Sequence, residues 1–211
     1  MAVLSISRQF GAGGLTLGKS ISTQLGYKFV SSQIIDEMAK EANVSLAWIK
    51  GVEKHAGDWL MRFVNRFVNT SFIERHVGQT KTDFDEKKYV TFLQSIVKRI
   101  ADEDNVIILG RGSQYILQDR ENVIHLLLVA DLDDRIRFLE KSWKMSRRDA
   151  EREILIREKR RDAFMKYFEL GPPNNPNLYH MVLNTSKIDF AEAKRIIILM
   201  VKDFEDRIGK K

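Results

Sequence analysis

The chain has 211 residues, of which 44% are hydrophobic and 30% charged, and it contains no cysteine. This composition is typical of one globular domain and excludes a disulfide framework, a thiolate metal cluster and a cysteine nucleophile. The 35 basic against 29 acidic residues give a net charge of +6. Such a charge suits nucleic acid, a membrane surface or a phosphorylated small molecule, and equally a mildly basic surface without a partner.

No segment of the sequence resembles a targeting or membrane-spanning element. The N-terminal residues MAVLSISRQFGAGG have no leading basic residue, and their apolar run is too short for a secretory signal. No stretch approaches the roughly 20 apolar residues of a membrane span. We therefore expect a soluble, cytoplasmic protein.

The first half of the chain is expected to hold two short strands separated by a helix, followed by a long helical region. A glycine cluster follows the first strand, and Gly26 closes the first helix. The expected strands are residues 3–7 and 27–30, and the later helical segments are 33–55, 58–77 and 86–102, with a loop at 78–85.

The second half alternates strands with helices. Continuous apolar runs at 106–109 and 123–129 are typical of strands buried on both faces, as in a parallel sheet. We expect a last strand at 179–183, helices at 132–143 (with Asp131 as N-cap), 147–168 and 190–208, and a loop at 171–177 that holds all three prolines. The alternation predicts an α/β fold with about five strands.

The glycine cluster predicts a phosphate-binding loop in one of two registers. Gly13–Ser20 (GGLTLGKS) matches the pattern GxxxxGK[ST], but Gly13 lies several residues beyond the first strand, and the helix would be barely two turns long. Counting from the strand end gives Arg8–Leu15 (RQFGAGGL), with Gly14 in the lysine position. We prefer this second register because its helix has an ordinary length. Arg8 and Lys19 are then the candidates for the phosphate-binding cation.

The segments ISRQFGAGG, ILGRGSQYIL, REKRRDAF and LNTS, in this order, resemble the cytidylate kinase-like family of P-loop proteins. The resemblance implies one three-layer α/β/α P-loop kinase domain with a parallel sheet. Its core would be residues 1–32, 103–145 and 178–211, with a helical acceptor-binding insert at about 33–102 and a helical lid at about 146–177. It also implies phosphoryl transfer from ATP, with Mg²⁺, to a nucleotide acceptor, most specifically a nucleoside monophosphate such as CMP.

The resemblance also assigns roles to residues. Arg111 would hold the acceptor's phosphate, Glu158 its ribose hydroxyls with Arg157 beside it, and Arg161 the transferring phosphate. A charge run like 157–161 is also typical of a solvated helix. Residues that would bind the donor nucleotide are Gly11, Ala12, Gly13, Gly14, Leu15, Thr16 and Arg135, and Thr16 would also contact the metal.

Two departures from the family pattern and the missing loop lysine leave the activity open. Leu109 replaces an acid before the Gly-Arg pair, and Val30-Ser31 replaces a tyrosine-aspartate pair. Gly14 stands in the lysine position, although the family's own glycine-rich loop often lacks the lysine too. A nucleotide-binding regulatory or interaction protein without catalysis is therefore the alternative function. A nucleic-acid binder is less favoured because no recognised module accompanies the positive charge. We expect a small-molecule acceptor, and neither nucleic acid nor membrane, as the partner.

Two further patterns carry expectations. The four histidines show no metal-ligand spacing, and His125, inside an apolar strand, is expected to be a hydrogen-bonded core residue. The aromatic stripe at 59–73 fits the core of the insert, a subunit contact or a membrane-surface helix. We favour a homo-oligomer contact.

Overall fold

The computed structural model describes residues 2–32, 86–167 and 171–209. The chain divides into two compact units, Met1–Ser32 with Val97–Lys211, and Gln33–Ile96. The aromatic stripe at 59–73 and the other segments expected between 33 and 85 lie outside the described residues. All site residues discussed below belong to the first unit.

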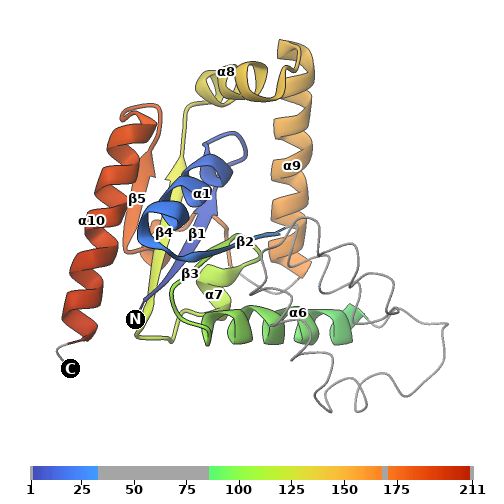
Figure 1. Cartoon of the computed structure of the whole chain (residues 1–211). Helices are drawn as coiled ribbons and strands as arrows, with labels where there is room; N and C mark the ends of the chain where they lie inside the picture. The colour runs from blue at the N-terminus through green and yellow to red at the C-terminus, as the bar shows by residue number, and fades with distance from the viewer. Residues whose placement is uncertain (1, 33–85, 168–170, 210–211) are drawn as a thin grey trace, which may run out of the picture. The chain divides into compact units, whose positions relative to one another are not determined.

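Five parallel strands form one sheet in the order β2-β3-β1-β4-β5 (Figure 1). This confirms the α/β class and the parallel sheet. The two continuous apolar runs form β3 and β4, with the predicted bounds. Their sequences are continuously apolar because strands of a covered parallel sheet are buried on both faces. The strands are β1 (Val3–Arg8), β2 (Lys28–Ser31), β3 (Val106–Leu109), β4 (Val123–Val129) and β5 (Met181–Asn184).

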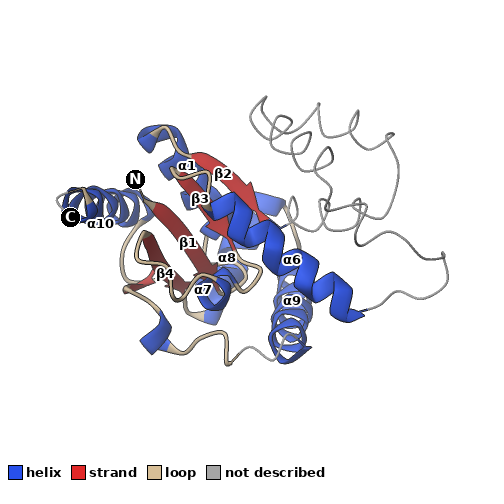
Figure 2. Cartoon of the chain, turned by 90° about the horizontal axis from the view of Figure 1, so that it is seen from below, coloured by secondary structure: helices blue, strands red, loops and turns tan. Residues whose placement is uncertain are grey.

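Helices cover both faces of the sheet (Figure 2). The main core joins α1 and α10 to the face of the sheet that carries Leu4, Ile6 and Leu126. On the opposite face, α7 meets β1 through a 2.8 Å hydrogen bond between the hydroxyls of Ser113 and Ser5. The helices are α1 (Gly14–Leu25), α6 (Glu86–Ala101), α7 (Ser113–Ile116), α8 (Leu132–Trp143), α9 (Arg147–Tyr167) and α10 (Phe190–Ile208), with a 3₁₀ turn at Pro176–Leu178.

The first helix begins where the second register of the phosphate loop predicts. Gly13 is the N-cap residue, in the left-handed conformation at φ 80°, and the 12-residue helix starts at Gly14. Gly18, the second glycine of the GxxxxGK[ST] pattern in Gly13–Ser20, is buried within this helix. A Cβ there would lie 2.5 Å from the Phe29 ring, so this glycine serves close packing of α1 on β2.

Several local predictions were wrong. The last strand begins at Met181, two residues later than expected, and the short helix α7 was not anticipated. Asp131 occupies the N-cap position of α8, but its side chain makes no capping bond and contacts Lys187 at 3.4 Å instead. His125 is a buried core residue as expected, but its ring nitrogens make no hydrogen bond of ordinary geometry in the described structure.

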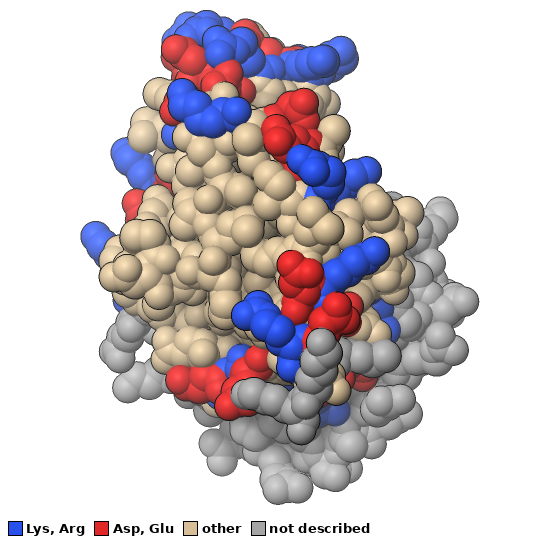
Figure 3. All heavy atoms as spheres, turned by 90° about the vertical axis from the view of Figure 1, so that its left-hand side faces the viewer, with Lys and Arg blue, Asp and Glu red and all other residues tan. Residues whose placement is uncertain are grey.

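Basic and acidic side chains lie close together on the face that Figure 3 shows. Figure 3 shows basic and acidic side chains together at the upper end of one face, the end at which α8 and α9 meet in Figure 1. Ion pairs join the two signs there, Arg137 with Asp134 and Arg147 with Asp133. Exposed pairs of this kind contribute little to stability. Among the described helices, none is both long and apolar enough to cross a bilayer.

Candidate nucleotide-binding site

The site candidates gather at the carboxyl edge of the sheet. β1 lies between β3 and β4 and ends at Arg8, and the glycine loop runs from there to α1. β3 ends at Leu109 and leads directly into Gly110-Arg111. The connection from β1 leads to β2, whereas that from the adjacent β3 leads to β4, in the opposite direction along the sheet. Ligands of open α/β sheets bind where adjacent strands connect in opposite directions.

The glycine loop is fastened to the neighbouring strands. The side-chain oxygen of Gln9 accepts a 2.9 Å hydrogen bond from the N–H of Ala130, after β4. Thr185, after β5, donates to the carbonyl of Ala12 at 3.3 Å. A Cβ at Gly13 would overlap the ring of Phe190, and one at Gly11 would lie 2.8 Å from Cβ of Arg135. The loop therefore needs glycine at these two positions for close packing.

The start of α1 is suited to an anion. Its first turn contains no acidic residue, and its N-terminal N–H groups and dipole favour negative charge. Gly14 is buried at this end, whereas Leu15 and Thr16 are exposed in the first turn. Lys19 lies farther along the helix and is also exposed.

Arg8, Arg111 and Arg161 come together beside this loop. Burial, followed by the charges of Arg161 and Arg111, lowers the pKa of Arg8 to about 10, so Arg8 remains charged at neutral pH. Arg8 donates to the Ser32 hydroxyl at 3.2 Å, and Nε of Arg111 donates to the Ser32 carbonyl at 3.3 Å. Like charges held this close favour a bound anion.

The backbone that carries Arg111 is strained. Gly110, Arg111 and Gly112 all have positive φ, at 85°, 58° and 67°. A non-glycine residue in this region costs about 1–2 kcal/mol and is typical of functional sites. The Arg111 guanidinium lies 5.1 Å from the centre of the Phe164 ring, a cation–π contact with α9.

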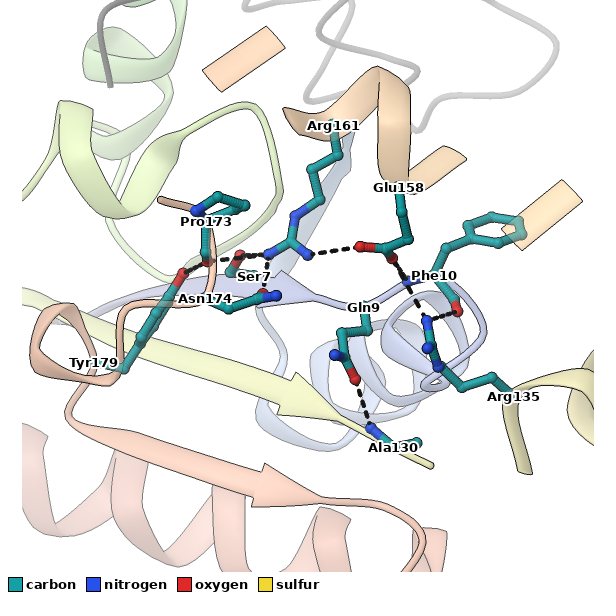
Figure 4. A network of polar contacts seen from close by, with 10 residues as sticks. All are labelled: Ser7, Gln9, Phe10, Ala130, Arg135, Glu158, Arg161, Pro173, Asn174 and Tyr179. Carbon is teal, nitrogen blue, oxygen red and sulfur yellow. Dashed lines mark hydrogen bonds and ion pairs between the residues drawn. The ribbon is translucent and has the colours of Figure 1, made fainter. Parts of the chain in front are cut away.

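Glu158 is the carboxylate that meets these cations (Figure 4). One of its oxygens accepts a 2.6 Å hydrogen bond from the loop N–H of Phe10 and lies 3.7 Å from Arg135. The other oxygen lies 3.4 Å from Arg161. The carboxylate thus ties α9 to the loop.

Arg161 has three further acceptors, all neutral (Figure 4). Its Nη2 donates to the Ser7 hydroxyl at 3.2 Å, to the Pro173 carbonyl at 3.0 Å and to the Asn174 side-chain oxygen at 2.9 Å. The hydroxyl of Tyr179 also donates to the Pro173 carbonyl, at 2.7 Å. The guanidinium is therefore oriented from several sides.

Arg135 and Arg157 differ in their surroundings. Arg135 is mostly buried and donates to the Phe10 carbonyl at 3.4 Å, while its Nε is buried without a hydrogen-bond partner in the described structure. Arg157 is exposed, pairs with Glu153 at 2.6 Å, and lies over the Phe10 ring at 5.4 Å. Arg157 and Trp143 thus both contact the ring of Phe10.

The motifs identified the cations but not the groups that orient them. Ser7, Gln9, Asn174 and Tyr179 belong to the site's network, and no sequence pattern singled them out. The one available signal was the concentration of all three prolines between α9 and β5. Among the described residues, no cluster of three acidic or histidine side chains could hold a metal ion.

The chain has recognisable relatives. The model of the cytidylate kinase-like family matches residues 3–187. The chain belongs to this family. No curated protein matches it. In fold the chain is similar to an uncharacterized protein from Eubacterium ventriosum ATCC 27560, with a TM-score of 0.68 and 16% identity over 96% of this chain and 99% of that one.

Two kinases of known name are more distant. A gluconokinase from Sinorhizobium meliloti has a TM-score of 0.49 and 10% identity, over 99% of this chain and 95% of that one. A shikimate kinase from Acinetobacter baumannii, in complex with shikimate, has a TM-score of 0.45 and 15% identity, over 96% and 94%. These likenesses are too remote to assign a substrate to this cytidylate kinase-like protein.

Proposed function

We propose that the protein transfers a phosphoryl group from ATP to a small nucleotide, a nucleoside monophosphate such as CMP. The observation that carries this proposal is the convergence of Arg8, Arg111 and Arg161 beside a glycine loop. Guanidinium groups bind phosphate with charge-assisted, often bidentate hydrogen bonds, and a phosphorylated ligand would relieve their mutual repulsion. Family membership supports a kinase, whereas CMP itself rests on the sequence resemblance.

The donor's phosphates would lie along the loop and the start of α1. The N–H groups at the start of α1 and the helix dipole are available to them, and Arg135 lies beside the loop. Mg²⁺, when bound with ATP, neutralises the charge of the donor phosphates, and the exposed hydroxyl of Thr16 is the first-turn group that would hold it. The donor-binding residues would be Gly11, Ala12, Gly13, Gly14, Leu15, Thr16 and Arg135.

Arg111 would bind the acceptor's phosphate, while Arg161 and Arg8 stabilise the transferring group. An oxygen of the acceptor phosphate forms the new bond to the γ-phosphorus, and the bond from that phosphorus to the β–γ bridging oxygen breaks, leaving ADP. Such a transfer depends mainly on positioning and charge stabilisation, which arginines supply. If Gly13–Ser20 is the phosphate-binding loop instead of Arg8–Leu15, Lys19 would be the cation that binds the donor's phosphates.

A phosphate acceptor fits this site better than a hydroxyl acceptor. A phosphate monoester has a second pKa near 6, so at neutral pH its attacking oxygen is already ionised and needs no general base. A hydroxyl acceptor is commonly served by a carboxylate. Here β3 ends in Leu109, and Glu158 is already bound to Phe10 N–H and Arg161.

The test is a panel of nucleoside monophosphates and non-phosphorylated acceptors, each supplied with ATP and Mg²⁺, with ADP formation as the readout. We expect a monophosphate to raise ADP formation well above the rate with ATP alone. A second candidate function, nucleotide binding without catalysis, is favoured by Gly14 in the lysine position and by Leu109. Tight ATP binding with no acceptor-dependent ADP formation across the panel would select that function.

A further inference from the structure

The segment Gly171–Asn175, which we call the strap, is built into the site by two tyrosines. The hydroxyl of Tyr115, in α7, donates to the carbonyl of Pro172 at 3.1 Å. The hydroxyl of Tyr179 donates to the carbonyl of Pro173 at 2.7 Å. At Gly171 a Cβ would lie 2.5 Å from the Tyr115 hydroxyl, so the strap approaches α7 closely.

The strap in turn holds the guanidinium of Arg161. Two of the acceptors of its Nη2 belong to the strap, the Pro173 carbonyl at 3.0 Å and the Asn174 side-chain oxygen at 2.9 Å. The Pro173 oxygen therefore accepts from both Arg161 and Tyr179. Only 17% of the Arg161 side chain is exposed, which limits the other orientations open to it.

The chemistry of these acceptors matters because they are neutral. A carboxylate partner, such as Glu153 beside Arg157, orients an arginine but also cancels its charge. Carbonyl, amide and hydroxyl oxygens orient the guanidinium and leave its positive charge available to an anion. Arg161 has Glu158 as its one carboxylate contact within the described structure, at 3.4 Å.

We propose that Tyr179 and Asn174 are positioning residues that hold Arg161 toward the phosphate site. This inference rests on the proposed function, in which Arg161 binds the transferring phosphate. Tyr179 fixes the Pro173 carbonyl, and the carbonyl and Asn174 together fix Nη2 of Arg161. Loss of either group would let the guanidinium rotate without removing any charge from the site.

Tyr179→Phe, made in the native chain and in an Arg161→Ala chain, tests this role. The affinity for inorganic pyrophosphate is measured by titration calorimetry, and the unfolding midpoint of each variant is recorded. In the native background we expect affinity to fall roughly two- to tenfold, the effect of one neutral hydrogen bond. In the Arg161→Ala background Tyr179→Phe should change nothing further, because its effect passes through Arg161.

Asn174 gives an independent check with a matched control. Asn174→Ala should weaken pyrophosphate binding as Tyr179→Phe does, and Asn174→Asp should weaken it more because a carboxylate would neutralise Arg161. Asn177, three residues along the same loop and likewise exposed, serves as the control, and Asn177→Ala should leave the affinity unchanged.

The outcomes separate this inference from the proposed function. Equal losses from Tyr179→Phe in both backgrounds, or no loss in either, would overturn the positioning role. A native protein that binds pyrophosphate with the expected coupling but forms no ADP with any acceptor would overturn the kinase activity alone. Absence of measurable pyrophosphate binding by the native protein would overturn the positioning role, whereas ADP formation across the acceptor panel still decides the kinase activity.

Discussion

The carboxylate of Glu158, in α9, accepts a 2.6 Å hydrogen bond from the backbone N–H of Phe10, in the glycine loop. The same carboxylate lies between Arg135 and Arg161, at 3.7 and 3.4 Å. It thus makes the contacts that a phosphate oxygen would make with a loop N–H and two cations. This side chain therefore supplies negative charge to Arg135 and Arg161.

Glu158→Gln should therefore strengthen ATP binding, by roughly two- to tenfold if one screened charge contact of about 0.5–1.5 kcal/mol is relieved. The amide oxygen can still accept from Phe10, so the loop keeps its partner while Arg135 and Arg161 lose their counter-charge. The measurement is calorimetric ATP affinity. Glu153→Gln, on the same helix but paired with Arg157 on the exposed side, is the control. Weaker ATP binding by Glu158→Gln would mean that the carboxylate supports the donor site.

Arg111→Ala should weaken the acceptor far more than ATP. Loss of a charge-assisted, bidentate phosphate contact is worth about 1.5–3 kcal/mol, or roughly a ten- to hundredfold rise in the acceptor's KM. Steady-state kinetics with each substrate varied in turn gives both constants. Arg120→Ala removes a surface arginine that pairs with Asp102 and should change neither constant. Equal effects of Arg111→Ala on both substrates would place Arg111 outside the acceptor site.

Arg8→Ala should reduce ATP affinity more than Lys19→Ala, by roughly tenfold. Arg8 is half-buried beside Arg111 and Arg161, whereas Lys19 is exposed on α1. Affinities are compared at the same ionic strength because salt weakens exposed charge contacts. A larger loss of ATP affinity in Lys19→Ala than in Arg8→Ala would show that Gly13–Ser20 is the phosphate-binding loop.

The protein should lose stability in mild acid because of His125. Burial, followed by the charge of His180, lowers the pKa of His125 to about 4, below the ordinary 6.5. Between these values the unfolded chain binds a proton that the folded chain does not. The free energy of unfolding therefore falls as the pH drops through this window, by up to about 3 kcal/mol. The lowered pKa of His180, caused by burial and Arg207, acts in the same direction.

Urea unfolding at several pH values from about 7 down to 4.5 measures this dependence. His125→Leu should flatten the curve, since an apolar side chain fits a position where neither ring nitrogen has a hydrogen-bond partner in the described structure. An unchanged slope in His125→Leu would assign the acid sensitivity to other groups.

Much of the fold could be predicted because long apolar patterns decide it. The bounds of β3, β4, α8 and α10 follow from continuous or periodic apolar runs. β5 was misplaced because it is an edge strand with only partial burial, so its alternation is weak. α7 has four residues, fewer than a helical period can reveal.

The residues of the site likewise fall into those that the sequence could predict and those that it could not. Arg8, Arg111, Glu158 and Arg161 stand in local motifs, whereas the acceptors that orient Arg161 come from separate segments. The Ser7 hydroxyl is 154 residues away in the sequence and meets Arg161 only after the sheet and α9 are assembled. Its identity as an acceptor depends on tertiary structure, which periodicity does not encode.

Phe10 is held by α8 and α9 through every group it has. Its N–H binds Glu158, its carbonyl accepts from Arg135, and its ring contacts Trp143 at 5.5 Å and Arg157. A nucleotide can displace Glu158 only after the contacts between Phe10 and these two helices have opened. The observed rate constant for nucleotide association should therefore level off at high nucleotide concentration, at the opening rate of the loop, and the indole of Trp143 offers a native fluorophore with which to follow it.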